Sequence, residues 1–299
     1  MPVTAITLVC NPASPALNPD MAEAALNTLG AFGRVESQTL SEGIAEDFVI
    51  AAAPPRAEIN DALAGLIARR PIDIIIQPAR YRRKRVLIAD MDSTIIAQEC
   101  IDELADFAGV RNEVAAVTER AMRGELGFEG ALTERVAMLK GLSSQTLEDC
   151  FNSRITLNPG AERLVRTMNA HGALTMLVSG GFTFFVERVA RRAGFQAWRA
   201  NNLEIENGRL TGRIIPPVIG REAKQAALLD AIAQANVTSE ESLAVGDGAN
   251  DLDMIAAAGL GAAYRAKPKV AAAADARIEY GDLTALLFAQ GFDRSCFSE

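Results

Sequence analysis

The sequence predicts an α/β protein in which a Rossmann-like, doubly wound parallel sheet carries an inserted helical cap and follows a small α+β domain. The length of 299 residues suggests two domains, at about 150 residues for each. From about residue 85, short apolar runs alternate with helical patterns, which is typical of parallel strands covered by helices on both faces. About 80 residues of helical pattern separate the first two runs, which is too long for a simple crossover and indicates an insertion.

The first domain is expected over residues 1–80, in the order strand, helix, strand, strand, helix, strand. Its strands are rich in Ile, Val and Thr or alternate apolar with polar residues, and its helices carry apolar residues at three- and four-residue spacing. This order predicts a small ferredoxin-like sandwich. The expected strands are Val3–Cys10, Arg34–Leu40, Glu46–Ala52 and Ile72–Gln77, and the expected helices are Ala22–Leu29 and Ile59–Ala68.

The same order resembles that of ACT-type modules, which sense amino acids and accompany enzymes of amino-acid metabolism. After the first strand, this chain has Asn11-Pro-Ala-Ser-Pro15 in place of the glycine-rich turn that such modules commonly use for ligands. Two interpretations of the first domain therefore stay open, a sensor of serine and a degenerate module that serves packing or assembly. A homodimer also stays open, because the sequence does not establish the oligomeric state.

Charge and cysteine content exclude several classes of protein. Lys and Arg number 30 against 38 Asp and Glu, for a net charge of −8, and so acidic a chain is poorly suited to bind nucleic acid or an anionic membrane. No apolar run approaches the ~18 residues that span a bilayer, and the N-terminus lacks the basic start of a secretion signal. The four cysteines form no CxxC pair, so we expect reduced, mostly buried thiols in a cytoplasmic protein. The basic stretch Arg80-Tyr-Arg-Arg-Lys-Arg85 is expected to be a solvated linker.

A single histidine, His171, limits the chemistry of the chain. It lies where a helix is expected to end with Gly172 in the left-handed conformation, so a structural role is favoured. Sites with several histidines are therefore excluded, and Ser-His-Asp and phosphohistidine mechanisms are disfavoured. Carboxylates, a lysine and a metal ion are left to carry any catalysis.

The second domain, residues 85–299, places polar residues at the ends of three predicted strands, Val86–Ala89, Leu174–Val178 and Leu243–Val245. Ligands of open α/β sheets bind at the carboxyl ends of such strands. The helical cap is expected at about residues 99–165, between the first and second strand. The segments that follow the strands are Asp90-Met-Asp-Ser-Thr94, Ser179-Gly-Gly181 and Gly246-Asp-Gly-Ala-Asn-Asp251.

Carboxylates in these segments predict a magnesium site. Asp90 and Asp92 lie two residues apart, and two carboxylates this close need a cation or a shared proton. Asp247 and Asp251 add negative charge at the same edge, and Mg²⁺ prefers oxygen ligands while leaving room for phosphate oxygens. Each segment alone could be a turn or a helix cap, but three of them at three strand ends favour a catalytic site.

A phosphate group is the substrate feature that the other polar residues predict. Ser179 and the glycines after it open a helix, where exposed amides favour a phosphate. Lys224 can supply a positive charge to that phosphate and to Asp90. A phosphorylated substrate is thus predicted from the residues alone.

Together these segments resemble the four motifs of the haloacid dehalogenase-like hydrolases, with Met91 where that family often has Phe. Over about residues 85–290 the chain is similar, more narrowly, to the members that hydrolyse phosphoserine in the last step of serine biosynthesis. The further segments that carry this similarity are Glu99-Cys-Ile-Asp-Glu103, Met122 with Phe128, Arg135-Val-Ala-Met-Leu-Lys140, Ala200-Asn-Asn-Leu203 and Gly208-Arg-Leu-Thr-Gly212.

The resemblance implies a role for each residue of the site. Asp90 is expected to attack phosphorus and form an aspartyl-phosphate, and Asp92 to protonate the leaving serine hydroxyl and then activate water. Mg²⁺ is expected to bind the Asp90 side chain, the Asp92 backbone carbonyl and Asp247, with Asp251 orienting its water ligands. The phosphoryl oxygens are expected to contact Ser179, Gly180, Lys224 and Asn250.

The cap is expected to recognise the amino-acid end of the substrate. By the resemblance, Arg135 binds the carboxylate through two parallel hydrogen bonds, and Glu99 binds the ammonium group. Met122 and Phe128 are expected to shield the site.

Two other activities stay open. One is phosphoryl transfer to an acceptor such as homoserine, which would use the same nucleophile. The other is sensing of a phosphorylated ligand without catalysis, against which the intact Asp90, Asp92 and Lys224 argue. Because all of these residues follow Arg85, a chain that begins near Arg82 is expected to fold and to keep catalysis.

Overall fold

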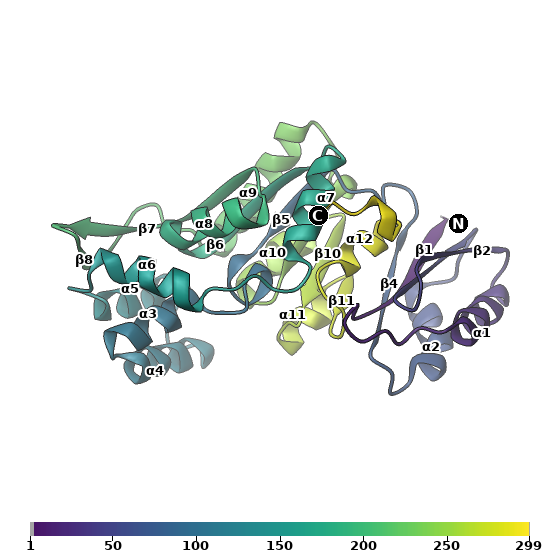
Figure 1. The fold of residues 1–299 in the computed structure, drawn as a ribbon, viewed down its shortest axis with the longest axis horizontal. Coiled ribbons are helices and arrows are strands. Elements are labelled where there is room, and N and C mark those ends of the chain that lie inside the picture. The colour runs from purple at the N-terminus through teal and green to yellow at the C-terminus, as the bar shows by residue number, and fades with distance from the viewer. Residues whose placement is uncertain (1–2, 299) are drawn as a thin grey trace.

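The computed structural model describes residues 3–298, apart from the side chain of Met122. Within this range, one sheet of eleven strands runs along an elongated molecule, with an antiparallel N-terminal unit at one end and a helical insert at the other (Figure 1). In spatial order the strands are β2 (Val35–Ser41), β3 (Ala45–Ile50), β1 (Thr4–Cys10), β4 (Ile72–Pro78), β11 (Ala276–Ile278), β10 (Leu260–Tyr264), β9 (Ser242–Gly246), β5 (Val86–Ala89), β6 (Leu174–Phe182), β7 (Ala197–Glu206) and β8 (Arg209–Ile215).

The N-terminal unit has the predicted ferredoxin-like topology. Strands β2, β3, β1 and β4 pair antiparallel in this order, and helices α1 (Pro19–Gly30) and α2 (Arg56–Ile67) pack on one face of them. Helix α1 begins three residues before the predicted Ala22, because the Asn18 side chain accepts a hydrogen bond of 2.9 Å from the Met21 N–H and caps the helix.

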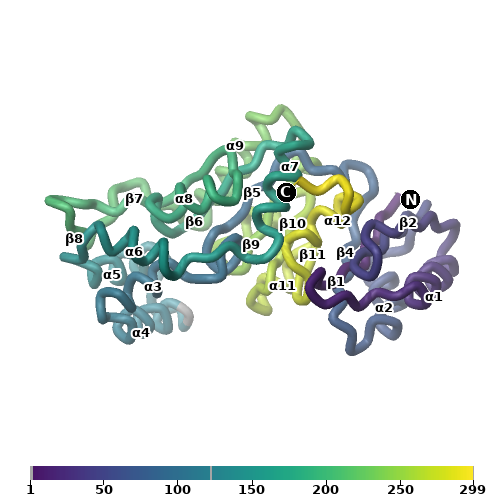
Figure 2. Tube along the Cα trace, viewed as in Figure 1, coloured from purple at the N-terminus to yellow at the C-terminus, as the bar shows by residue number. Residues whose placement is uncertain are grey.

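The two sheets that the sequence predicts as separate are joined. Strand β4 pairs antiparallel with β11, through Ile75 and Ala276. Helix α12 (Ala285–Ala289), near the C-terminus, packs against the second face of the N-terminal sheet. This helix lies between β1 and the central sheet (Figure 2). Val9 and Ala45 of this sheet share one buried core with Leu286 and Phe288 of α12. The C-terminal helix therefore stabilises both parts of the chain.

The prediction of a solvated linker holds for Arg80, Tyr81, Arg83 and Arg85, which are exposed, but was wrong for Arg82 and Lys84. Both terminal guanidinium nitrogens of Arg82, Nη1 and Nη2, donate to the carboxylate of Asp47, at 2.8 and 2.7 Å, and Nη2 also donates to the Ala289 carbonyl at 3.0 Å. Lys84 is buried, and its Nζ donates to the Glu240 carbonyl at 2.7 Å. Buried cations need charged or carbonyl partners, and through these partners the two side chains hold together the N-terminal unit, α12 and the segment just before β9.

The central sheet is doubly wound, as predicted. Strands β11, β10, β9, β5, β6 and β7 are parallel, and the chain order reverses at β5, between β9 and β6. The predicted apolar run of β5 is completely buried, because helices cover both faces. Helices α7 (Ala161–Ala170), α8 (Thr183–Ala193) and α12 lie on one face, α9 (Arg221–Ala235) and α10 (Leu252–Ala257) lie on the other, and α11 (Pro268–Ala273) packs beside α10.

The helical insert between β5 and β6 consists of helices α3–α6, and the β7–β8 hairpin packs against α5. Helix α7, which begins inside the range expected for the cap, packs against β6 and α8 and belongs to the central layers. It ends at His171, and Gly172 has φ +79°, which confirms the predicted structural role of this pair. The insert helices are α3 (Cys100–Ala108), α4 (Arg111–Met122), α5 (Phe128–Met138) and α6 (Ser144–Arg154).

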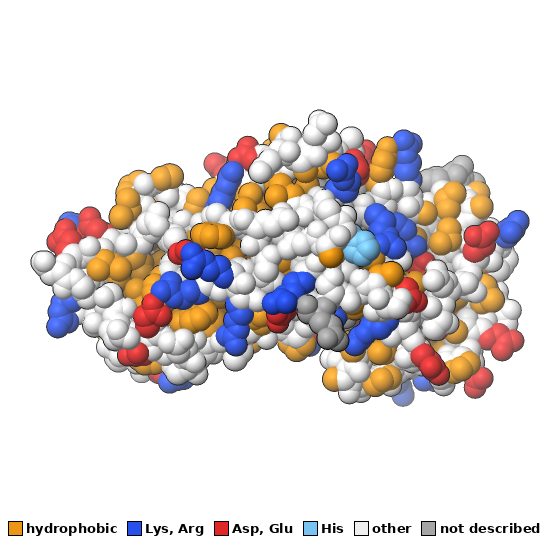
Figure 3. All heavy atoms as spheres, turned by 45° about the horizontal axis from the view of Figure 1, so that its top comes forward, with side chains coloured by type: hydrophobic (Ala, Val, Ile, Leu, Met, Phe, Trp, Pro, Cys, Tyr) orange, Lys and Arg blue, Asp and Glu red, His pale blue; other side chains and the backbone are white. Residues whose placement is uncertain are grey.

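The distribution of surface charge and the burial of the cysteines are the next features to compare with the predictions from sequence. Basic and acidic side chains lie interspersed on the face shown in Figure 3. Cys10, Cys100 and Cys150 are buried free thiols, as predicted, whereas Cys296 is exposed. No helix within residues 3–298 combines the length and the apolar content needed to cross a membrane.

Candidate active site

A cavity of about 460 Å³ lies at the carboxyl ends of β5, β6 and β9, below the helical insert. These strands are neighbours on either side of the point where the chain order reverses, which is where open α/β sheets bind ligands. The three strand-end segments are therefore brought together as predicted. The predicted residues that line the cavity are Asp90, Asp92, Glu99, Phe128, Arg135, Ser179, Gly180, Asp247 and Asn250.

A tight turn after β5 positions the first two carboxylates. Asp90 is extended (φ −72°, ψ 158°), and its side chain accepts a hydrogen bond of 2.7 Å from the Met91 N–H. Ser93 has φ 57°, which reverses the chain so that the Ile96 N–H donates to the Met91 carbonyl at 3.0 Å. Both Asp90 and Asp92 thereby face the cavity.

Lys224 lies behind the cavity and is completely buried. Its Nζ donates to Asp90 Oδ1 and to Asp251 Oδ1, each at 2.6 Å. Burial alone would lower the pKa of Lys224, but the two carboxylates outweigh it and raise that pKa. Lys224 is therefore charged at neutral pH. The other carboxylate oxygen of Asp251 accepts hydrogen bonds from the N–H groups of Asp247, at 3.2 Å, and Gly248, at 3.0 Å.

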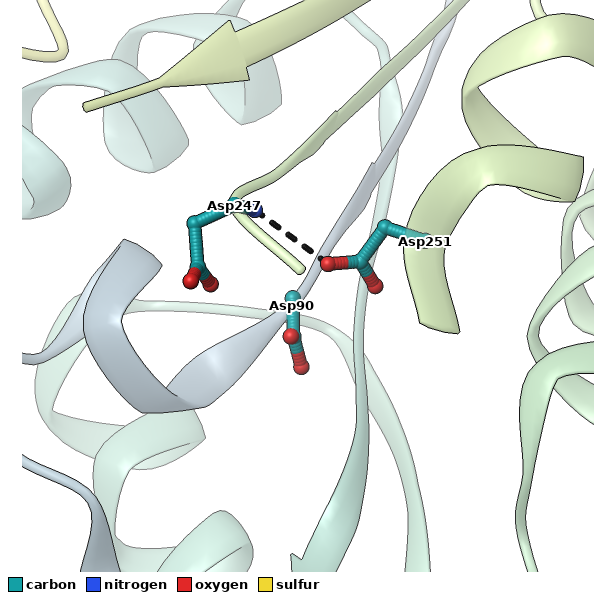
Figure 4. Close-up of side chains that lie close together, drawn as sticks. All are labelled: Asp90, Asp247 and Asp251. Carbon is teal, nitrogen blue, oxygen red and sulfur yellow. Dashed lines mark hydrogen bonds between the residues drawn. The ribbon is translucent and has the colours of Figure 1, made fainter. Parts of the chain in front are cut away.

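Three carboxylates converge on a common space from two segments of the chain, one after β5 and one after β9 (Figure 4). One oxygen of each of Asp90, Asp247 and Asp251 lies within 4.8 Å of the others. Burial, and then the charge of Asp251, raise the pKa of Asp247 to about 6, and burial raises that of Asp90 well above its usual value. Lys224 offsets only part of this negative charge, so the cluster is able to hold a metal ion, and its all-oxygen ligands suit a hard divalent cation.

Asp92 differs from the other carboxylates in its partners. Its Oδ1 accepts a hydrogen bond of 2.9 Å from the Cys100 N–H, and its Oδ2 accepts one of 3.2 Å from the Ser179 hydroxyl. Its side chain thus turns toward the cap and the loop that contains Ser179. Burial raises the pKa of Asp92, which favours the protonated form needed by a general acid.

On the cap side, two opposite charges line the cavity without pairing. Arg135 is half-buried and donates to the Ala131 carbonyl at 3.2 Å, but no carboxylate of the described chain lies within 4.0 Å of its guanidinium. Burial lowers the pKa of Arg135. Glu99 accepts a hydrogen bond of 2.7 Å from the Ser93 hydroxyl and has no cationic side chain within the same distance in residues 3–298.

The Glu99 side chain faces the open cavity, but protein atoms surround it and remove much of its hydration. This desolvation and, to a smaller extent, the negative charge of Asp92 raise the pKa of Glu99 to about 7. The Phe128 ring lies over Gly180 and Gly220 at the mouth of the site. The side chain of Met122, also predicted to shield the site, lies outside the described residues.

Two charged residues that sequence reasoning missed also line the cavity. Asp102 lies one helical turn after Glu99 in α3, so the i, i+3 spacing was an available signal. Lys267 lies after β10, and its N–H donates to the Asp247 carbonyl at 3.2 Å. Its position next to Asp247 depends on the pairing of β10 with β9, which the sequence alone does not show.

Comparison with known proteins places this geometry in a family. The profile of the haloacid dehalogenase-like hydrolases matches residues 87–256, which contain the strand-end segments. A phosphoserine phosphatase from Archaeoglobus fulgidus is 45% identical over 232 residues, which cover 77% of this chain and 67% of the relative. The chain belongs to the phosphoserine phosphatases of the haloacid dehalogenase-like hydrolases.

Solved structures agree with this membership in the phosphoserine phosphatases. A haloacid dehalogenase family hydrolase from Salmonella enterica serovar Typhi has a TM-score of 0.84 at 30% identity and covers 96% of this chain and 98% of its own. A phospho-aspartyl intermediate analogue of a phosphoserine phosphatase has a TM-score of 0.64 at 38% identity and covers 69% of this chain and 98% of its own. The predicted fold class, family and enzyme class are thereby confirmed.

Proposed function

We propose that this phosphatase takes O-phosphoserine as its substrate and cleaves it through an aspartyl-phosphate on Asp90. The observation that carries the proposal is a pair of opposite charges without an ionic partner among the described residues, Arg135 and Glu99, which line the same cavity as Asp90. An amino acid presents one carboxylate and one ammonium group at a fixed separation. A cation and an anion that face a cavity and do not pair with each other are complementary to it.

The phosphate end of the substrate is proposed to lie between the strand ends and Lys224. Ser179 and the Gly180 amide would contact phosphoryl oxygens from β6, and Asn250 from the segment after β9. Lys224 would add a positive charge without moving, because its Nζ is held by Asp90 and Asp251. Such fixed donors stabilise charge in the transition state without reorganisation.

In the first step, Asp90 is proposed to attack phosphorus. Its Oδ1 already accepts two hydrogen bonds, from Lys224 and from the Met91 N–H, so Oδ2 is the oxygen left for attack. The new bond joins Asp90 Oδ2 to phosphorus, and the bond from phosphorus to the serine oxygen breaks. That oxygen takes the proton of Asp92, whose raised pKa keeps the proton available.

In the second step, the ionised Asp92 takes a proton from water while the water oxygen attacks phosphorus. The bond to Asp90 Oδ2 breaks, inorganic phosphate leaves, and both carboxyl groups return to their starting states. One residue thus serves as acid and then as base, which microscopic reversibility of the two half-reactions requires.

Mg²⁺ is the metal ion proposed for the acidic cluster. Asp90, Asp247 and the backbone carbonyl of Asp92 would hold it, while Asp251, whose oxygens are engaged by Lys224 and two N–H groups, would orient its water ligands. When bound, it supplies positive charge that neutralises phosphoryl oxygens during transfer.

Loss of metal should stop turnover. After dialysis against EDTA we expect phosphate release from phosphoserine to fall to background, and Mg²⁺ to restore it. Ca²⁺ should restore it poorly, because its larger and more flexible coordination shell lets a carboxylate bind through both oxygens. Full turnover in EDTA would contradict the metal site.

The substrate assignment is tested by Arg135→Ala. Its loss removes a charge-assisted pair of hydrogen bonds, each contributing about 1.5–3 kcal/mol, so kcat/KM for phosphoserine should fall by about a hundredfold or more. Turnover of p-nitrophenyl phosphate, which has no carboxylate, should change little. The ratio of the two activities in one preparation cancels errors in the folded fraction.

Arg111→Ala is the matched control, because Arg111 is an exposed arginine of the cap that pairs with Asp106 and does not line the cavity. It should leave the ratio unchanged. Equal losses on both substrates in Arg135→Ala would assign Arg135 to the fold or the phosphate site. Inorganic phosphate released from phosphoserine should also be compared with and without homoserine, since an acceptor-dependent loss of free phosphate would identify a transferase.

A cytoplasmic location stays part of the proposal. It is supported by the buried free thiols of Cys10, Cys100 and Cys150, because unpaired cysteines are typical of a reducing compartment.

A further inference from the structure

Asn201, in strand β7, bridges two loops of the active site with its side-chain amide. Its Nδ2 donates to the Gly180 carbonyl at 2.8 Å, and its Oδ1 accepts a hydrogen bond of 2.6 Å from the Ile219 N–H. Asn201 is completely buried, so water does not compete for these bonds. The residue belongs to the Ala200-Asn-Asn-Leu203 segment, for which sequence reasoning found no role.

The two loops that Asn201 connects carry the phosphate-binding groups. Gly180 lies next to Ser179 at the end of β6, in the stretch where the pairing of β6 with β7 is interrupted between Val178 and Phe182. Ile219 precedes Gly220, which begins α9, and the Lys224 N–H donates to the Gly220 carbonyl at 3.1 Å. The side chain of Asn201 thus supplies a link where the backbone ladder does not.

The same two loops form the seat of the cap residue Phe128. A Cβ placed on Gly180 would lie 2.9 Å from the Phe128 ring, and one placed on Gly220 would lie 3.4 Å from it. The ring therefore rests on both glycines at once. Its fit depends on the separation of the two loops, which is the distance that the Asn201 amide spans.

We propose that Asn201 is a positioning residue, which holds the phosphate-binding loop and the start of α9 at one separation. It affects phosphate binding through the positions of Ser179, Gly180 and Lys224. It affects the packing of the cap through the two glycines that Phe128 contacts. The inference deepens the proposed function and rests on it. Because these contacts concern the phosphate, the loss of Asn201 should affect every phosphate ester alike.

The first test is Asn201→Ala, which removes both hydrogen bonds. Per folded molecule, kcat/KM should fall about tenfold or more, by a similar factor for phosphoserine and for p-nitrophenyl phosphate. Inhibition by inorganic phosphate should weaken by a comparable factor. This pattern differs from that of Arg135→Ala, which spares p-nitrophenyl phosphate.

The second test is Asn201→Asp, which has almost the same shape. A protonated carboxyl can donate to Gly180 and accept from Ile219, whereas an ionised one cannot donate. The kcat/KM of this variant relative to the parent should therefore fall as pH rises from about 6 to about 9, while that of Asn201→Ala should stay constant. Asn202→Asp is the matched control, because Asn202 is the exposed neighbour in the same strand, and it should follow the parent at each pH.

A lower melting temperature with unchanged kcat/KM per folded molecule in both Asn201 variants would overturn the proposal, since it would show a purely structural role. A loss confined to phosphoserine would overturn it too. Failure of the proposed function is read separately, in the parent: a parent that turns over p-nitrophenyl phosphate but not phosphoserine would refute the substrate, and p-nitrophenyl phosphate would still report on Asn201.

Discussion

The charged residues of this site differ in whether an oppositely charged side chain lies beside them. Lys224 is buried between Asp90 and Asp251, so its charge is held beside Asp90, the proposed nucleophile. Arg135 and Glu99 line the cavity without ionic partners among the described residues. Desolvation lowers the pKa of Arg135 and raises that of Glu99, so it favours the neutral form of each side chain. Charges left in this state are the ones that a zwitterionic substrate can pair with.

The pH dependence of substrate binding follows from Glu99. Its pKa is raised to about 7 in the free enzyme, so its carboxylate takes up a proton and loses its charge as pH falls through that value. Since only the ionised form attracts the ammonium group, kcat/KM for phosphoserine should fall between about pH 8 and about pH 6. The measurement is the ratio of parent to Glu99→Gln, which cancels titration of the substrate itself.

With p-nitrophenyl phosphate the same ratio should not vary with pH, because this ester has no ammonium group. A flat ratio with phosphoserine would separate Glu99 from substrate recognition.

At the scale of secondary structure, the end of strand β9 brings its backbone close to the side chain of Asp251. Strand β9 ends at Gly246, and the Asp251 side chain folds back over it to receive the N–H groups of Asp247 and Gly248. A Cβ on Gly246 would lie 2.4 Å from the carboxyl carbon of Asp251. The glycine is therefore required by packing, not by an unusual φ.

Gly246→Ala should displace Asp251 and with it the buried contact to Lys224. We expect a loss of stability of about 1–3 kcal/mol from overpacking and a fall in kcat of tenfold or more, because Lys224 and the metal site both depend on Asp251. Thermal unfolding and phosphate release measure the two effects.

Gly65→Ala is the matched control for this substitution. Gly65 lies in exposed helix α2 with nothing within 4 Å of its Cβ position, so the change should raise stability by up to about 1 kcal/mol and leave activity alone. Normal activity in Gly246→Ala would show that Asp251 can shift without consequence.

At the scale of the whole molecule, the N-terminal unit and the catalytic part share one sheet and one buried core, although the strands of the first are antiparallel and the central strands of the second are parallel. We propose residues 1–80 and 85–299 as the two domains, with α12 packed against the sheets of both. Asp73 of β4 also accepts hydrogen bonds from the N–H groups of Glu279 and Gly281, at 3.0 and 2.8 Å. The junction is thus both apolar and polar.

A chain that begins at Arg82 should consequently be less stable than the full chain, although it is still expected to fold and to keep catalysis. It would expose Leu286 and Phe288, which are now completely buried. At about 1.5–3 kcal/mol for each side chain and 2–4 °C per kcal/mol, the melting temperature should fall by about 10 °C. Differential scanning calorimetry of both chains measures this.

Activity per folded molecule should stay within a few-fold of the full chain, because every cavity residue follows Arg82. An unchanged melting temperature would show that α12 does not need the N-terminal sheet.

Much of this protein follows from the sequence alone, because the relevant signals are local. The apolar run of β5 reports its burial directly, and the carboxylates of Asp90 and Asp247 follow their strands without a break. Parallel strands bring such ends together whatever the details of packing. Hence the fold class and the acidic cluster were predictable.

Only the tertiary structure decided which distant residues meet. Arg82 and Lys84 look like parts of a solvated linker until Asp47 and the Glu240 carbonyl receive them. Asn201 has no role that the sequence indicates, and its role follows only from the positions of Gly180 and Ile219 on either side of it. Burial of a polar group is tolerated only when a partner is present, and those partners come from segments whose proximity no local pattern encodes.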